Sequence, residues 1–307
     1  MQSATIPPPA ASRASLVVPA LLACYLIWGS TYLAIRYALE SFPPFFQMGT
    51  RFLTAGALLF AWQMWSARRA RRDCVFPDRT QWRNALIVGT LMLGGGMGLC
   101  ATAEQTIGSG LVAAFIAVTP MWTCGWGLMF GQRPGRLEFV GMTVGVAGVV
   151  LLVRGTSFAA SPVGVAAVAG ATLAWSLGSV LSTNKFRLAP GAMGFASEML
   201  CGGAMLMLLS LAMGENPVWP AQPQAVLAWL YLVVFGSLIA FSAYLYLLAN
   251  SSAAVATSYA FVNPVIALFL GVVLASEHVA AGEWIACGVI VAGVFLIFRG
   301  KTASNPK

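Results

Sequence analysis

Charged residues are scarce in this sequence: Asp, Glu, Lys and Arg make up only 8% of its 307 residues. A soluble protein usually carries about 25%, so an ordinary water-exposed surface is excluded. Hydrophobic residues make up 59% of the chain, and they gather in runs of about 20, the length that a helix needs to cross a bilayer core of about 30 Å. The alternating segments of about 10 residues that a membrane β-barrel requires are absent. The composition therefore predicts an all-α membrane protein.

Residues that support metal or nucleotide chemistry are also rare. The single histidine, His278, falls in a predicted link between helices, which excludes a buried histidine relay. None of the six cysteines forms a CxxC pair or another metal-ligand spacing, so we interpret them as small apolar residues. The phosphate-binding pattern GxxxxGK[ST] does not occur. We therefore expect no cofactor, and any transport must use an ion gradient or the gradient of the solute itself.

Ten apolar runs are long enough to be membrane spans. The predicted spans are residues 16–38, 44–65, 82–102, 107–130, 137–154, 162–182, 191–213, 224–248, 253–275 and 282–299. The segment before them, residues 1–15, contains three consecutive prolines and small polar residues. It is predicted to form a flexible tail.

The basic residues gather in alternate links, and basic links face the cytoplasm. The outer ends keep two arginines, Arg36 and Arg154, and collect five glutamates. An odd number of spans would move the C-terminal basic cluster outside, so the pattern independently favours ten spans with both termini in the cytoplasm. It also assigns the net charge of +8 to membrane orientation, and we expect no nucleic-acid partner. The residues assigned to the inner side are Arg13, Arg68, Arg69, Arg71, Arg72, Arg79, Arg83, Arg133, Arg136, Lys185, Arg187, Arg299, Lys301 and Lys307.

The two halves of the sequence resemble each other. A shift of 147 residues places Trp28 on Trp175, and a shift of 144 places "FIAVTP" on "YAFVNP", so that Pro120 matches Pro264. Five spans per repeat is an odd number, and the second copy must then cross the membrane in the opposite sense. Inverted repeats are typical of alternating-access transporters, whose substrate site lies near the midplane between the halves.

The matched prolines and tryptophans lie in the middle of predicted spans. Pro120 and Pro264 each follow a polar residue and remove a backbone donor, so they are predicted to act as hinges or to free carbonyls for binding, with a plain bend as the alternative. Trp28 shares a helix face with Tyr32, which suits an aromatic binding wall, with helix packing as the alternative. Two GxxxG spacings, Gly94–Gly98 and Gly141–Gly145, indicate close helix packing.

Two buried charges, Arg51 and Glu198, are mates under the shift of 147 residues. Each lies about seven residues, or about 10 Å, from opposite faces of the membrane, so we do not expect them to pair with each other. A gating pair and a static clamp remain open for each charge, and Glu198 is also a candidate proton carrier if transport is proton-coupled. The predicted partners are Glu40, Glu104 or outer-end carbonyls for Arg51, and Lys185 or Arg187 for Glu198.

Several motifs resemble the EamA-type exporters of the drug/metabolite transporter superfamily. They are "YLIWGSTYLAIRYALESFPP", "RFLTAG", "ATSYAFVNPVIALFLGVVLASE" and "EWIACGVIVAG". The resemblance covers residues 16–300, with one repeat in residues 16–155 and a second in 160–300. It implies ten helices in two inverted five-helix repeats, a bacterial inner-membrane location, and export of amino acids, related metabolites or drugs.

The resemblance also implies a central cavity lined by the first, third, fourth, sixth, eighth and ninth spans. We therefore predict a monomeric secondary exporter of amino acids or similar small amphiphilic molecules. The alternatives are a multidrug or toxic-cation exporter and, more distantly, an intramembrane enzyme, although the spans hold no nucleophile–base pair or metal cluster. The candidate substrate-binding residues are Trp28, Thr31, Tyr32, Phe115, Thr119, Trp122, Trp175, Ser179, Tyr244, Tyr259 and Asn263.

Overall fold

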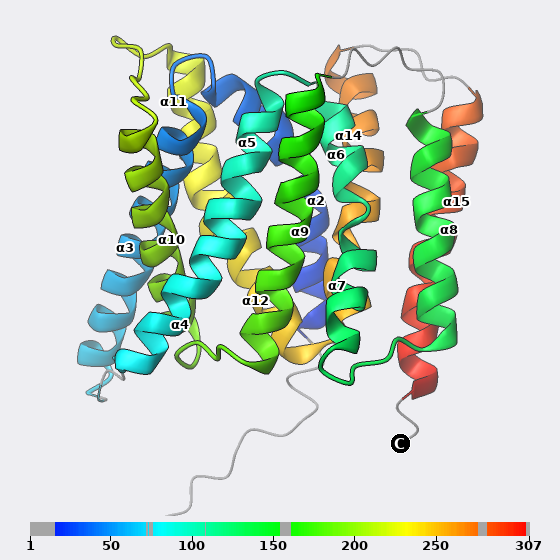
Figure 1. Ribbon diagram of the computed structural model, residues 1–307, viewed down its shortest axis with the longest axis horizontal. Coiled ribbons are helices and arrows are strands. Elements are labelled where there is room, and N and C mark those ends of the chain that lie inside the picture. Colours follow the sequence, from blue (N-terminus) through cyan, green and yellow to red (C-terminus); the bar gives the residue numbers. More distant parts are fainter. Residues whose placement is uncertain are drawn as a thin grey trace, which may run out of the picture.

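The computed structural model in Figure 1 describes residues 16–71, 73, 76–107, 109–153, 161–275 and 281–304, and within these ranges every regular element is a helix. The first half contains α2 (Val17–Ala38), α3 (Pro44–Arg69), α4 (Arg79–Gly89), η1 (Thr90–Gly98), α5 (Leu99–Glu104), α6 (Ser109–Ile116), α7 (Thr119–Leu128) and α8 (Arg136–Val153). The second half contains α9 (Pro162–Asn184), α10 (Ala192–Ala212), α11 (Pro223–Tyr231), η2 (Leu232–Ile239), α12 (Ala240–Asn250), α13 (Ala253–Thr257), α14 (Tyr259–Ala275) and α15 (Ala281–Ser304).

Among the residues that the structure describes, five helical stretches are long and apolar enough to cross a membrane: Val17–Ala38, Arg79–Glu104, Pro162–Asn184, Ala192–Ala212 and Pro223–Asn250. Shorter apolar helices cover Val112–Leu128, Ala253–Ile266 and Trp284–Gly300. Most helix ends lie within a few residues of the predicted span edges, because apolar runs end where polar links begin. The tail of residues 1–15, together with Arg154 and His278, lies outside the described residues.

Local capping explains where two of the helices begin. Asp78 and Gln81 form a capping box at the start of α4, which satisfies two backbone donors that a helix start leaves unpaired. Pro44 opens α3, and the next two backbone N–H groups, of Phe45 and Phe46, donate to the carboxylate of Glu215 at 3.1 and 2.7 Å. Glu215 follows α10 in the second half, so this cap ties the two halves together.

Two helical segments depart from α-geometry in matching places. The π-helix η1 continues α4, and the π-helix η2 continues α11, in the third and eighth predicted spans, which are mates in the repeat. π-Helical segments are rare and occur mostly at functional sites. The two halves therefore share an irregular feature that the hydrophobic pattern does not reveal.

The predicted proline positions behave differently from each other. The chain turns between α6 and α7, and Pro120 follows within the first turn of α7, where a missing N–H costs nothing. Pro264 lies inside α14, and the break in that span comes earlier, at Ser258 between α13 and α14. Both spans are interrupted near their prolines, while the hinge role itself stays a prediction.

Helices that are mates in the repeat pack against each other: α3 along α10, and α8 along α15. Figure 1 shows the α8–α15 pair at one side of the bundle and α3 with α10 at the other. A Cβ on Gly293 would lie 2.6 Å from the Gly145 nitrogen, and one on Gly141 would lie 2.6 Å from the Gly293 oxygen. The predicted packing role of the Gly141–Gly145 spacing is confirmed.

Within the glycine-rich segment of η1, some glycines pack closely and others do not. A Cβ on Gly95 would lie 2.6 Å from the Ala174 Cβ, and one on Gly98 would lie 2.8 Å from Leu206 Cδ2. Gly94 has its nearest neighbours at 3.8 and 3.9 Å, which is ordinary contact. The close packing that the spacing predicted is therefore confirmed for Gly98, whereas Gly94 makes only ordinary contact with Met205 of α10.

Candidate functional site

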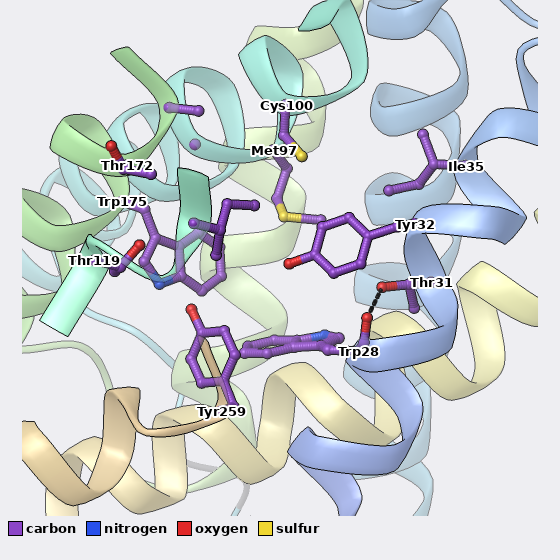
Figure 2. Close-up of a pocket in the computed structure, with 13 residues that line it drawn as sticks. Trp28, Thr31, Tyr32, Ile35, Met97, Cys100, Thr119, Thr172, Trp175 and Tyr259 are labelled. Carbon is purple, nitrogen blue, oxygen red and sulfur yellow. Dashed lines mark hydrogen bonds between the residues drawn. The ribbon is translucent and has the colours of Figure 1, made fainter. Parts of the chain in front are cut away.

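A cavity of ≈ 50 Å³ lies at the centre of the bundle, where α2, η1, α5, α6, α7, α9 and α14 meet (Figure 2). This volume is far below the roughly 300–1,000 Å³ of a pocket that encloses a drug-sized ligand. The cavity is therefore too small for such a ligand, and side chains must move before a solute can occupy it. Its lining residues are Trp28, Thr31, Tyr32, Ile35, Gly96, Met97, Cys100, Ile116, Thr119, Ala171, Thr172, Trp175 and Tyr259.

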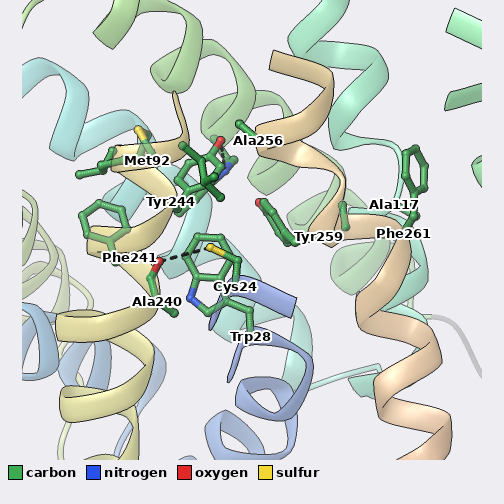
Figure 3. Packing of buried hydrophobic residues seen from close by; sticks show 14 of the residues in the cluster. Cys24, Trp28, Met92, Ala117, Ala240, Phe241, Tyr244, Ala256, Tyr259 and Phe261 are labelled. Atoms are coloured by element: carbon green, nitrogen blue, oxygen red, sulfur yellow. Dashed lines mark hydrogen bonds between the residues drawn. The ribbon is translucent and has the colours of Figure 1, made fainter. Parts of the chain in front are cut away.

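Four aromatic rings form a cluster at one side of this cavity (Figures 2 and 3). The Trp28 ring is central: its centroid lies 5.6 Å from Trp175, 5.2 Å from Tyr244 and 4.6 Å from Tyr259. The rings meet edge to face or tilted, the arrangements that aromatic quadrupoles favour. Trp28 and Trp175 are mates in the repeat, so the two halves of the chain meet at this cluster.

Hydrogen bonds fix the orientation of the two tryptophans. Trp28 Nε1 donates to the carbonyl of Gly236 in η2 at 3.2 Å, and Trp175 Nε1 donates to the Tyr244 hydroxyl at 3.2 Å. The Tyr244 hydroxyl also bonds to Ser179 at 2.8 Å. A buried donor without a partner costs free energy, so these bonds select one orientation for each indole ring.

Apart from Trp122, the predicted binding residues divide into three groups. Those that line the cavity are Trp28, Thr31, Tyr32, Thr119, Trp175 and Tyr259. Three lie one layer behind it: Tyr244 and Ser179 support Trp175, and Asn263 Nδ2 donates to the Tyr32 hydroxyl at 3.2 Å. Phe115 is half-buried in a neighbouring apolar cluster that includes Tyr32.

Trp122 does not belong to the site, and its prediction as a lining residue is wrong. The side chain is 42% exposed, whereas Thr119 and Thr123 on the same helix are buried. The break between α6 and α7 sets which face of α7 turns inward, and that face carries the two threonines. Trp122 therefore points away from the bundle interior.

Several lining residues were not predicted, among them Met97, Cys100 and Thr172. Met97 lies in the glycine-rich stretch that we interpreted as packing surface. That stretch packs closely and also lines the cavity, since a Cβ on Gly96 would lie 2.9 Å from the Trp175 ring. Thr172 lies three residues before Trp175, so helical spacing was a usable signal for it. The remaining ones, Ile35, Gly96, Ile116 and Ala171, carried no distinguishing signal.

A second pocket of ≈ 290 Å³ lies one helical turn further along α7 and α9, where Thr123 and Ser179 take the places that Thr119 and Trp175 hold in the central cavity. It is more polar. The buried Glu138 accepts hydrogen bonds from the Ser252 hydroxyl at 2.7 Å and from the Gly135 N–H at 3.0 Å. We did not predict this pocket from the sequence, because its polar groups come from two links and three separate helices.

The predicted partners of Arg51 are wrong. Its side chain is 0% exposed, Nε donates to the Ser237 hydroxyl at 2.7 Å, and Nη1 lies 3.5 Å from the Met48 sulfur. The guanidinium also lies over the Phe52 ring, 4.8 Å from its centroid. Nη2 has no hydrogen-bond partner. Arg51 points across to η2 rather than along α3 to the helix end, so neither outer glutamate pairs with it.

The predicted partners of Glu198 are wrong as well. The side chain is 0% exposed, and neither carboxyl oxygen has a hydrogen-bond partner. Lys185 and Arg187 lie beyond the N-terminal end of α10, and Glu198 is too far along that helix for either to reach it. As the depth argument predicted, Arg51 and Glu198 do not bond to each other.

A helical membrane bundle with a small aromatic cavity between two internal repeats is typical of a membrane transporter. The chain belongs to the EamA-like transporter family, which matches residues 15–154 and again residues 162–299. It is thereby a membrane transporter of the drug/metabolite transporter superfamily.

Relatives and a solved structure agree with this assignment. The chain is 40% identical over 283 residues to the uncharacterized inner membrane transporter YedA of Escherichia coli K12, covering 92% of this chain and 90% of that protein. An uncharacterized transporter of Synechocystis is 24% identical over 307 residues, with 90% and 88% covered. A solved crystal structure superposes with a TM-score of 0.75 at 21% identity, covering 97% of this chain and all of that one, which shows a shared fold.

Proposed function

We propose that this protein is a secondary exporter of amino acids or related small amphiphilic metabolites across the bacterial inner membrane. The single observation that carries the proposal is the central cavity, where Trp28 and Trp175, mates in the repeat, meet 5.6 Å apart. In an inverted-repeat transporter, the substrate site lies near the midplane between the two halves. An aromatic wall with a few hydroxyl groups suits a solute that has an apolar body and a polar end.

We further propose ten membrane-spanning helices in two inverted repeats, acting as a monomer with both termini in the cytoplasm. The support is a set of matched helix contacts. Helix α3 packs against α10, and α8 packs against α15. The π-helix η1 contacts α9, and its mate η2 contacts α2 in the same way. Such pairings are those of two copies related by a twofold axis. The basic links then face the cytoplasm on the side of the second pocket, which includes Arg133.

Alternating access follows from the relation between the two pockets. The second pocket is the entry vestibule, and the central cavity is the binding site. Between them lies the layer of Trp175, Tyr244 and Ser179, joined by hydrogen bonds of 3.2 and 2.8 Å. A solute passes when this layer opens. Two hydrogen bonds between the halves break in the same step: Gln132–Asn184 at 2.9 Å and Glu138–Ser252 at 2.7 Å.

An exporter of organic cations is the second candidate, because tryptophan and tyrosine faces attract ammonium groups. That function is favoured by the aromatic cluster but has no carboxylate among the residues that line the central cavity. An intramembrane enzyme is a distant third, and the relatives that the chain matches are named transporters.

Purified protein in liposomes tests the proposal. We expect uptake or counterflow of some members of a panel of labelled amino acids, measured with and without a proton gradient, and faster excretion of the same amino acids by overproducing cells. Transport of organic cations alone would replace the proposal with the second candidate. Movement of neither class would contradict both.

A further inference from the structure

Arg51 is a fully buried guanidinium without a counter-ion. Nε donates to the Ser237 hydroxyl, Nη1 contacts the Met48 sulfur, and Nη2 has no hydrogen-bond partner. No carboxylate in the described part of the chain bonds to it. Burying a charge is costly unless the charge is paired, so a permanent cation here needs a compensating anion that these residues do not supply.

The guanidinium lies directly behind the wall of the central cavity. A Cβ on Gly236 would lie 2.6 Å from Arg51 Nη2 and 3.2 Å from the methyl carbon of Thr31, so the cation and this lining residue flank the same small space. The charge is therefore one side-chain layer from the space that a solute would occupy.

Nearby groups do not neutralise this charge. Glu104 lies one turn beyond Cys100 on α5, but both of its carboxyl oxygens lack a hydrogen-bond partner, so it does not bond to Arg51. Gln47, one turn before Arg51 on the same face of α3, is fully buried with both amide atoms unpaired. Arg51 Nη2 and Gln47 Nε2 are thus buried hydrogen-bond donors to which no anion is bonded in the described part of the chain.

The cavity itself presents hydroxyl, thiol, aromatic and aliphatic groups, and no residue that lines it is charged. In such a weakly screened interior a nearby charge acts over a longer distance than in water. A guanidinium matches a carboxylate in charge and in its forked hydrogen-bonding geometry. The space beside Arg51 therefore favours a solute that carries a carboxylate.

We propose that Arg51 is a specificity-determining residue that provides the counter-charge for a carboxylate on the transported solute. The aromatic cluster of Trp28, Trp175, Tyr244 and Tyr259 would hold the apolar body of the same molecule. The inference rests on the proposed transport function and narrows its substrate class to small carboxylates, which include amino acids. It assigns no carboxylate-binding role to Glu198, the mate of Arg51 in the other half.

Matched ligand pairs test the inference on the wild-type protein. L-phenylalanine and L-leucine differ from their amides mainly in carboxylate charge, and binding can be followed by the ligand-induced shift of thermal unfolding in nanodiscs. A charge-assisted hydrogen bond is worth about 1.5–3 kcal/mol, so each amino acid should bind at least about tenfold more tightly than its amide. Equal affinity for acid and amide, with binding established for both, would overturn the inference while leaving the transport function intact.

Variants separate a specificity role from a structural one. Arg51→Gln should lose the preference for the acid by about tenfold or more while its affinity for the amide stays unchanged, and Arg51→Lys should keep part of the preference. Ser237→Ala is the matched control, because it removes a partner of Arg51 and keeps the charge. If Arg51→Gln weakened acid and amide equally, Arg51 would be only structural. If Arg51→Gln does not fold, the wild-type pairs decide alone.

The two proposals fail in different ways. If no member of the panel binds or moves, the proposed function fails. If amino acids move but the amides move equally well, only the role of Arg51 fails.

Discussion

At the scale of single residues, the site depends on which way each side chain faces. Trp28 and Trp122 are both tryptophans in apolar helices, yet one is buried in the aromatic cluster and the other is 42% exposed. Trp28 donates a hydrogen bond across the repeat interface to the Gly236 carbonyl at 3.2 Å. The comparison provides a variant and its control within the same protein.

We predict that Trp28→Phe reduces transport of the preferred solute by about twofold to tenfold, because the Gly236 carbonyl loses a buried hydrogen bond worth roughly 0.5–1.5 kcal/mol and the smaller phenyl ring contacts its neighbours less fully. Trp122→Phe should transport as the wild type does. Initial rates in liposomes measure both, and size-exclusion profiles confirm that each variant is folded. Equal activity of Trp28→Phe and Trp122→Phe would remove Trp28 from the site.

The predicted direction of a side chain agrees with the structure along the regular face of α2 and differs from it at Trp122. Trp28, Thr31 and Tyr32 share one uninterrupted face of α2, and spacing alone predicted their common direction. Trp122 follows a helix break whose effect on direction is not encoded in the hydrophobic pattern. The partner of Arg51 lies 186 residues away, on η2, and no local signal connects the two.

At the scale of helices, glycines set how closely the repeat mates approach. Gly293 on α15 faces α8 with no room for a Cβ, whereas a Cβ on Gly288 of the same helix would meet nothing within 4 Å. Helix association in a membrane depends on such close contacts, because lipid supplies no hydrophobic driving force between helices. The apolar runs predicted both helices, and the Gly141–Gly145 spacing predicted this interface.

We predict that Gly293→Ala destabilises the protein by about 1–3 kcal/mol, the usual cost of forcing a methyl group into a tightly packed interface. Gly288→Ala should be neutral or slightly stabilising, since alanine has the higher helix propensity by about 1 kcal/mol. Thermal unfolding in detergent measures the difference. A Gly293→Ala protein as stable as Gly288→Ala would mean that the α8–α15 contact is not tight.

The π-helical segments are the elements that the sequence analysis missed. The apolar pattern predicts a span over residues 82–102 but does not separate α from π hydrogen bonding, since an apolar run is compatible with both. These segments nevertheless carry the carbonyl of Gly236 and the lining residues Gly96 and Met97. Their positions in the third and eighth predicted spans became visible only with the backbone.

At the scale of the whole molecule, alternating access between inverted repeats requires two halves that cross the membrane in opposite senses. The link after α10 holds Asn216, and the link after α3 holds Asp73. The charge pattern predicts that the first faces outward and the second inward.

We therefore predict that a membrane-impermeant maleimide labels Asn216→Cys in intact cells and labels Asp73→Cys only after the membrane is opened, in a background without the native cysteines. Each side chain is exposed, so access depends on membrane side alone. Labelling of both positions from outside would contradict the proposed topology.

The central claim is that solute binds between Trp28 and Trp175, where the two repeats meet. An experimental structure with a transported amino acid bound tests it most directly. We expect the apolar body of the solute to lie against the aromatic cluster and its carboxylate to lie on the side of Thr31 and Arg51. A solute bound elsewhere, with the Trp28–Trp175 contact unchanged, would contradict the account.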